Sequence, residues 1–173
     1  MKSYQWLFFI SLFSLNLILT GCEKPEEVIF SCERDGNGDY VTTVKNGGKT
    51  QNLIQWTRTD FVKAGFPPQR RCDEVTPRLQ EAYDNGSLKN LTWGYSESDN
   101  LKQYKSLCTT TGKDCHTLIL TLLEADDADK ELKNFSAVLN GDASLAYQNS
   151  FCAVNNYRLS CPIDIFRVFN QNK

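Results

Sequence analysis

The sequence predicts an α+β fold in which an antiparallel sheet of about five to six strands packs against one long helix and one or two shorter helices. Short β-branched segments, separated by turns rich in Gly and Asn, predict the strands. Two longer segments with apolar residues at helical spacing predict the helices. Six cysteines beyond the leader predict a disulfide-stapled domain. The order of three strands, a helix, three strands and a helix is typical of α+β domains.

The first three strands are expected at 28–34, 40–46 and 51–59. VIFSCER alternates apolar and polar residues, and YVTTVKN is rich in β-branched residues. The segment DGNGD at 35–39 and a Gly-Gly pair after the second strand supply the turns. Such short connections predict an antiparallel meander.

A long helix is expected after the Pro-Pro pair at 67–68, and the Asn-Gly pair at 85–86 ends it. The apolar residues that share one face at helical spacing are Cys72, Val75, Leu79, Ala82 and Tyr83. Pro77 interrupts this pattern, so the sequence predicts either a kink or a helix that restarts with Thr76 as its cap.

Three further strands are expected at 91–96, 104–109 and 116–124. A second helix follows from about Asp127 to Asn140, with Asp126 or Asp127 as its cap, acidic residues in its first turn and Gly141 just past its end. Its buried residues are expected to be Leu132, Phe135, Val138 and Leu139. A last short helix is expected around 163–169.

The N-terminal segment reads as a leader. Lys2 precedes an apolar run from Trp6 to Leu19, which as a helix would rise about 21 Å, short of the roughly 30 Å of a hydrocarbon core. This pattern is typical of a signal peptide. The sequence at 19–22, Leu-Thr-Gly-Cys, resembles the bacterial lipobox, in which the cysteine receives lipid before cleavage.

We therefore expect a lipoprotein signal peptide at 1–21, a short tether at 22–27 and one globular domain at 28–169. The alternative is that Cys22 is an ordinary thiol near an ordinary cleavage site. Two observations favour lipidation: the chain has seven cysteines, so that removing Cys22 leaves an even number, and the stretch that follows Cys22 is polar. Acyl chains such as palmitate would then hold the protein at a membrane, facing the periplasm or another extracytoplasmic space.

The mature chain is acidic. Without Lys2 it has 18 basic and 21 acidic residues, a formal net charge of −3. It lacks the basic footprint of a protein that binds nucleic acid. The expected partners are the membrane, through Cys22, and an unknown protein.

The six other cysteines lie beyond the signal peptide, where oxidation is expected. Fifteen pairings are possible in principle. Proximity along the chain suggests two pairs and leaves the third: Cys108–Cys115, Cys152–Cys161 and Cys32–Cys72. The alternative is a zinc or redox site, but the chain has no C-x-x-C and a single histidine, His116. Disulfides are favoured, and no metal or cofactor is expected.

Several motifs carry a family resemblance. They are the I-x-W strand at 54–56, the Pro-Gln-x-Arg-Cys helix start at 68–72 and the Gly-x-Leu turn at 86–88. The chain from Phe30 to Phe169 resembles the cyanobacterial circadian oscillating protein domain, to which the pair Cys152/Cys161 looks like an addition. The resemblance implies a membrane-associated protein whose family is named for rhythmic abundance. It implies no established activity and no catalytic residues.

Two polar segments resemble metal sites. Residues 35–39 place oxygen ligands at alternate positions, but an EF-hand would have Gly and Glu where Tyr40 and Asn46 stand. A hairpin turn explains these residues better. The acidic run from Glu124 to Glu131 is explained by a charged helix start.

Arg70, Arg71 and Arg78 flank the first helix and could bind an anionic group, although a solvated helix face is the simpler interpretation. Trp56 and Trp93 are expected to pack on the sheet, with partner binding as the alternative.

Three classes of function remain. The preferred class is a non-enzymatic lipoprotein that acts by interaction in the cell envelope. The second is a binding module, either a periplasmic inhibitor or a receptor for a small ligand, with Tyr157 and Arg158 as candidate partner-binding residues. The third is a hydrolase that uses carboxylates such as Asp73 and Glu74. A catalytic triad around His116 is not expected, because no nucleophile motif accompanies it.

Overall fold

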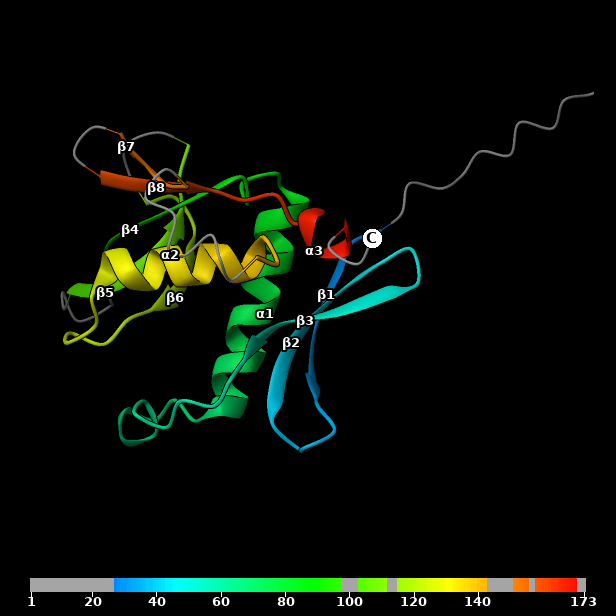
Figure 1. Cartoon of the computed structure of the whole chain (residues 1–173). Coiled ribbons are helices and arrows are strands. Elements are labelled where there is room, and N and C mark those ends of the chain that lie inside the picture. Colours follow the sequence, from blue (N-terminus) through cyan, green and yellow to red (C-terminus); the bar gives the residue numbers. More distant parts are fainter. Residues whose placement is uncertain (1–26, 98–102, 112–114, 143–150, 156–157, 171–173) are drawn as a thin grey trace, which may run out of the picture.

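The computed structural model describes residues 27–97, 103–111, 115–142, 151–155 and 158–170. The expected leader and nearly all of the expected tether, and with them Cys22, lie outside these residues. The described chain forms two antiparallel sheets and three α-helices (Figure 1). The α+β class predicted from the sequence is therefore confirmed, but the strands divide between two sheets of three and five strands instead of one.

The first sheet has the order β1-β2-β3. Its strands are β1 (Ile29–Arg34), β2 (Tyr40–Asn46) and β3 (Lys49–Gln55). The turn between β1 and β2 is the predicted hairpin: the backbone nitrogens of Asn37 and Asp39 each donate to the carboxylate oxygen Oδ1 of Asp35 at 2.9 Å. The side chain of Asp35 thus stabilises the turn by accepting these two hydrogen bonds.

The second sheet has the order β6-β5-β4-β8-β7. Its strands are β4 (Asn90–Glu97), β5 (Gln103–Thr109), β6 (Leu118–Thr121), β7 (Ala153–Asn155) and β8 (Arg158–Pro162). β8 pairs with β4 and places Ser160 opposite Thr92. No strand was expected between Cys152 and Cys161, but β7 and β8 lie there and extend the sheet.

The helices are α1 (Pro68–Asp84), α2 (Ala128–Leu139) and α3 (Arg167–Asn170). A 3-10 turn, η1 (Val62–Ala64), precedes α1. α1 runs through Pro77 without restarting, so of the two alternatives left open by the sequence, the helix restarted with Thr76 as its cap is wrong. Thr76 instead lies in the core, where its hydroxyl is 2.8 Å from that of Thr42 on β2. The cap of α2 is Asp127, whose side chain accepts from the backbone nitrogen of Lys130 at 3.1 Å.

The apolar faces of both helices are the predicted ones. On α1, Cys72, Val75, Leu79 and Ala82 are buried and Tyr83 is half-buried. On α2, Leu132 and Leu139 are buried, and Phe135 and Val138 are half-buried. These residues belong to one hydrophobic core that also contains buried residues of both sheets. The two sheets therefore share one hydrophobic core.

Three predicted elements are shorter in the structure. β3 ends at Gln55 instead of residue 59 because Trp56 turns into the core, where its Nε1 donates to the hydroxyl of Thr42 at 3.0 Å. β6 ends at Thr121. α3 begins at Arg167, because Ile163 and Ile165 are buried in the segment that leads to it.

Three disulfides cross-link the domain, and they are the pairs expected from the sequence. Cys32–Cys72 joins β1 to α1, Cys108–Cys115 joins β5 to the segment before β6, and Cys152–Cys161 closes the β7–β8 hairpin. All six cysteines beyond the leader are therefore oxidised. Within the described part of the chain, no helix combines the length and the hydropathy needed to cross a membrane.

Candidate functional site: an arginine-lined cleft

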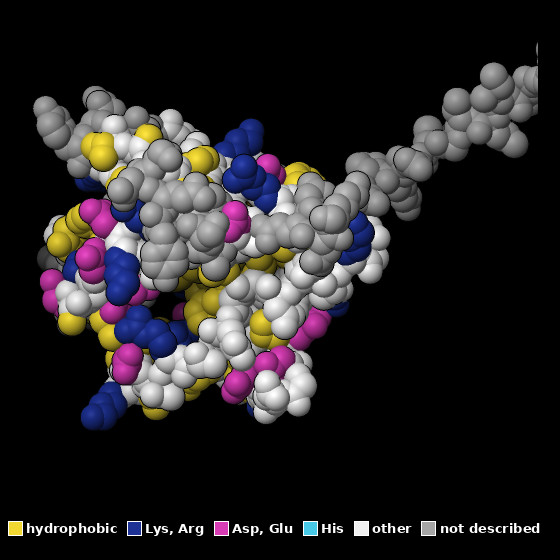
Figure 2. Space-filling model, in the orientation of Figure 1, with side chains coloured by type: hydrophobic (Ala, Val, Ile, Leu, Met, Phe, Trp, Pro, Cys, Tyr) yellow, Lys and Arg dark blue, Asp and Glu magenta, His cyan; other side chains and the backbone are white. Residues whose placement is uncertain are grey.

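A cleft of about 820 Å³ lies between α1, the segment that follows β3, β6 and the start of α2. Figure 2 shows it as a dark hollow below the position of α2, with Lys and Arg side chains along one rim and hydrophobic side chains along another. Its apolar lining includes Trp56, Phe61, Phe66, Leu118, Leu120 and Phe135. Four arginines line it as well: Arg58, Arg70, Arg71 and Arg78.

The loop before α1 forms one wall of the cleft. It folds back on itself, since the backbone nitrogen of Phe66 donates to the carbonyl oxygen of Phe61 at 3.0 Å. Gly65 allows this reversal with a φ of 84°, a conformation that other residues rarely adopt. The loop thereby presents both phenylalanine rings to the cleft.

Arg70 and Arg78 share one carboxylate. The Nε of Arg70 lies 2.6 Å from Oε1 of Glu74, and Nη2 of Arg78 lies 3.7 Å from Oε2. The guanidinium of Arg70 also stacks on the ring of Phe66 at 4.3 Å, and Arg78 donates to the carbonyl oxygen of Ile119 on β6 at 3.2 Å. Glu74 is therefore a positioning residue for two arginines on the same side of α1.

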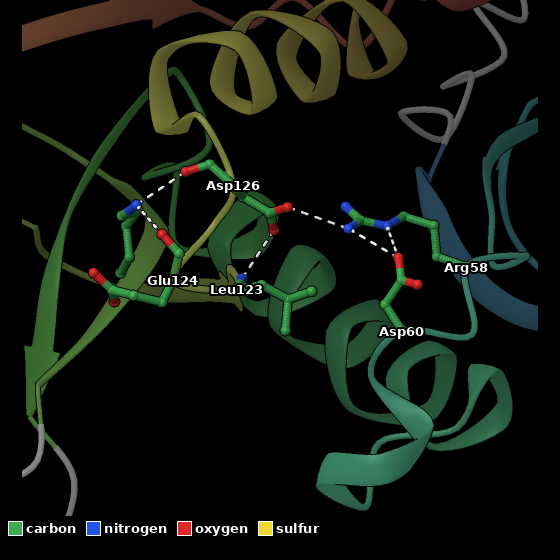
Figure 3. A network of polar contacts seen from close by, with 6 residues as sticks. Arg58, Asp60, Leu123, Glu124 and Asp126 are labelled. Atoms are coloured by element: carbon green, nitrogen blue, oxygen red, sulfur yellow. Dashed lines mark hydrogen bonds and ion pairs between the residues drawn. The ribbon is translucent and has the colours of Figure 1, made fainter.

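Arg58, which follows β3, pairs with Asp126, which follows β6 (Figure 3). Its guanidinium contacts Oδ2 of Asp60 and Oδ1 of Asp126, each at 3.2 Å. Burial acts to lower the pKa of Arg58, but the hydrogen bond and the charge of Asp126 outweigh it, with further contributions from Asp60 and Glu131, so the pKa is raised. Arg58 is held firmly in its charged form.

Arg71 stands in a different environment. Its guanidinium lies 4.9 Å from the ring centre of Phe61 and 5.5 Å from that of Trp56, and it donates to the carbonyl oxygen of Arg58. Among the described residues, no carboxylate lies within ion-pair distance of Arg71, and its Nε is buried without a hydrogen-bond partner. Burial and the positive charge of Arg58 lower its pKa, against a weaker effect of Asp60.

The structure brings together the three arginines that the sequence singled out and adds Arg58. Arg58 was not singled out from the sequence because it precedes the helix, and Asp126 was interpreted as a possible cap and as part of the acidic run at the start of the second helix, not as a partner of an arginine. The alternation of aromatic residues and arginines from Trp56 to Arg71 is the signal that would have found this site.

The other polar segments have structural roles. Asp35 holds the β1–β2 turn, Asp127 caps α2, and Asp129 accepts from Nε1 of Trp93 at 2.6 Å. His116 is exposed, and its Nδ1 is paired with the hydroxyl of Thr117. The described residues contain no group of three or more His, Cys, Asp and Glu side chains placed to hold a metal ion.

A second hollow, of about 850 Å³, lies along α1 next to Phe30 and Cys32 of β1. Three carboxylate residues line it, namely Asp73, Glu81 and Asp84, and all three are exposed. Exposed acidic residues at this spacing are typical of the polar face of an amphipathic helix. The pair named as carboxylates for a hydrolase is separated, since Glu74 lines the cleft instead and is paired with arginines.

Of the predicted partner-binding pair, the structure describes Arg158, whereas Tyr157 is outside the described residues. Arg158 is exposed at the start of β8, and its Nη1 would lie 3.6 Å from a Cβ added at Gly94. It is far in sequence from the arginines of the cleft and does not line it.

The fold and the cleft define a small α+β protein with three disulfides and a cleft lined by arginines and apolar side chains. A family model described as circadian oscillating protein COP23 matches residues 29–164. The chain therefore belongs to the circadian oscillating protein COP23 family, as the resemblance in the sequence indicated. Comparisons with curated proteins and with solved structures found no significant match.

Proposed function

We propose that this protein is a lipoprotein anchored through Cys22 to a membrane, with its domain in an extracytoplasmic space, and that it acts by binding instead of catalysis. The observation that carries the proposal is that the chain has an odd number of cysteines, which leaves one outside the disulfides. Six of the seven are joined in three disulfides, and the seventh stands at the end of the lipobox-like sequence. Stable disulfides are typical of oxidising compartments.

The length of the tether supports a role close to the membrane. Residues 22–27 span at most about 20–25 Å when extended, so the domain would stay near the bilayer surface. Acyl chains would hold it there without help from protein charge, since each buried methylene contributes about 0.8 kcal/mol. The acidic mature chain is consistent with attachment by lipid alone.

Replacing the anchor cysteine tests this proposal. The chain and its Cys22→Ser variant would be expressed in the same bacterial host, and membranes would be washed with high salt. The wild type should stay in the membrane fraction and be degraded by protease added to spheroplasts. The variant should keep its leader, because the lipobox cysteine is needed for lipid addition and cleavage. Identical processing and fractionation of both chains would overturn the anchor.

The cleft favours one version of the binding role, a receptor for a small ligand. Its volume of about 820 Å³ falls within the range of small-molecule sites, and its lining combines apolar side chains with a few convergent polar groups. The inhibitor version rests on the β7–β8 hairpin. Unchanged partner binding after substitution of Tyr157 and Arg158 would contradict that version.

A further inference from the structure

We propose that the cleft binds a small organic anion whose apolar body lies against the aromatic wall and whose carboxylate pairs with Arg71. This inference rests on the proposed binding function and names the class of ligand. Arg71 is the residue that carries it, because its charge lacks a carboxylate partner among the described residues while the other three arginines of the cleft each have one.

The surroundings of Arg71 leave its charge uncompensated. A buried donor without a partner costs free energy, and the Nε of Arg71 is such a donor. The guanidinium also lies near that of Arg58, since both contact the ring of Phe61. An anion bound here would accept from the guanidinium of Arg71.

The rest of the cleft fits an apolar body. Phe61 and Phe66 on the loop line the cleft together with Leu118, Leu120 and Phe135. Rings of this kind favour flat, aromatic or branched ligands, which bury large apolar areas. Glu74 is held by Arg70 and Arg78, and Asp126 by Arg58, so neither of these carboxylates pairs with Arg71. The ligand class that fits is therefore an aromatic carboxylate.

The test compares two probes that share a ring system and differ in charge, naphthoate and naphthamide. The purified full-length protein would be titrated with each by calorimetry, with a protein-free titration subtracted. A hydrogen bond to a charged group contributes enough for naphthoate to bind at least about tenfold more tightly than naphthamide. Equal affinities, or no binding of naphthoate, would overturn the proposal without bearing on the lipid anchor. This comparison needs no substitution.

Two variants then locate the site. Arg71→Met keeps the apolar stem and removes the charge, so the preference for naphthoate should disappear while naphthamide binding is retained. Arg34→Met is the matched control, because Arg34 also stacks on an aromatic ring, at 4.3 Å from the centre of Tyr40, but lies outside the cleft. It should bind both probes like the wild type. An Arg71→Met protein that keeps the full preference would show that the anion binds elsewhere.

Discussion

Arg58 and Asp126 join the two sheets of the molecule through an ion pair, with 3.2 Å between Nη2 and Oδ1. Arg58 follows β3 of the first sheet, and Asp126 follows β6 of the second (Figure 3). The side chain of Asp126 is only 10% exposed, and its Oδ2 also accepts from the backbone nitrogen of Leu123 at 2.8 Å. This carboxylate therefore fixes one edge of the cleft.

Substitution of Asp126 should destabilise the fold, and substitution of Asp60 should not. Asp126→Ala leaves the backbone nitrogen of Leu123 without its acceptor and removes the more buried of the two carboxylates that pair with Arg58, which should lower the free energy of unfolding by about 1–3 kcal/mol. Asp60 pairs with the same arginine, but its side chain is 60% exposed, and such pairs contribute about 0–1 kcal/mol. Urea unfolding of both variants measures the difference. Equal losses would contradict the assigned roles.

Asn140 should be one of the most sensitive polar positions. It is 1% exposed, and its Nδ2 donates to the carbonyl oxygens of Ser136 and Pro162 at 2.8 and 3.0 Å. Its Oδ1 accepts from the backbone nitrogen of Asp164 at 2.7 Å, so it ties α2 to the C-terminal segment. Asn140→Ala should cost about 3 kcal/mol, because buried groups lose their partners.

The control for Asn140 is Asn134, which is exposed on the same helix. Asn134→Ala should leave the urea midpoint unchanged or raise it slightly, because alanine has the higher helix propensity. A similar loss for the two variants would mean that the contacts of Asn140 add nothing to stability.

Gly94 should tolerate no side chain while the neighbouring disulfide is present. A Cβ at this position would lie 2.7 Å from Sγ of Cys115. Gly94→Ala should therefore destabilise the protein by about 1–3 kcal/mol. Gly36, which has no neighbouring atom within 4 Å of an added Cβ, is the control.

A double-mutant cycle isolates this contact. Replacing both Cys108 and Cys115 by alanine removes the sulfur, so the cost of Gly94→Ala should fall in that background. Thermal unfolding of the four proteins gives the coupling. A cost that is unchanged without the disulfide would place the strain elsewhere.

The disulfides should differ in their contribution to stability according to loop length. Cys32–Cys72 has a sequence separation of 40, compared with 7 for Cys108–Cys115 and 9 for Cys152–Cys161. The chain-entropy relation gives about 4 kcal/mol for the long loop and about 2.5 kcal/mol for each short one. Unfolding of the three paired Cys→Ala variants tests this order. A larger loss for either short loop would contradict it.

Local chemistry made part of the fold predictable. The turn at 35–39, the cap at Asp127 and the Gly141 that follows α2 are recognisable within a few residues, and these elements lie close to where they were expected. Gly141 has a φ of 68°, as a residue past a helix end often does. The disulfides could be inferred because two of the three close short loops.

The division into two sheets and the cleft depend on contacts between distant residues. β8 pairs with β4, with Ser160 opposite Thr92. The short, irregular sequence around β8 does not indicate which strand it pairs with. Arg58 and Asp126 are similarly far apart in the chain and meet only in the folded protein. The arginines near the helix were visible in the sequence, but which of them lacks a carboxylate partner depends on the tertiary structure.

The intact mass of the protein from a membrane fraction, with and without reduction and thiol labelling, tests the central claim most directly. We predict a lipid-modified chain that begins at Cys22 and takes up six labels only after reduction. This result would follow from the three disulfides and from a seventh cysteine occupied by lipid. An unlipidated chain, or one whose thiols react before reduction, would contradict the account of an exported, lipid-anchored protein.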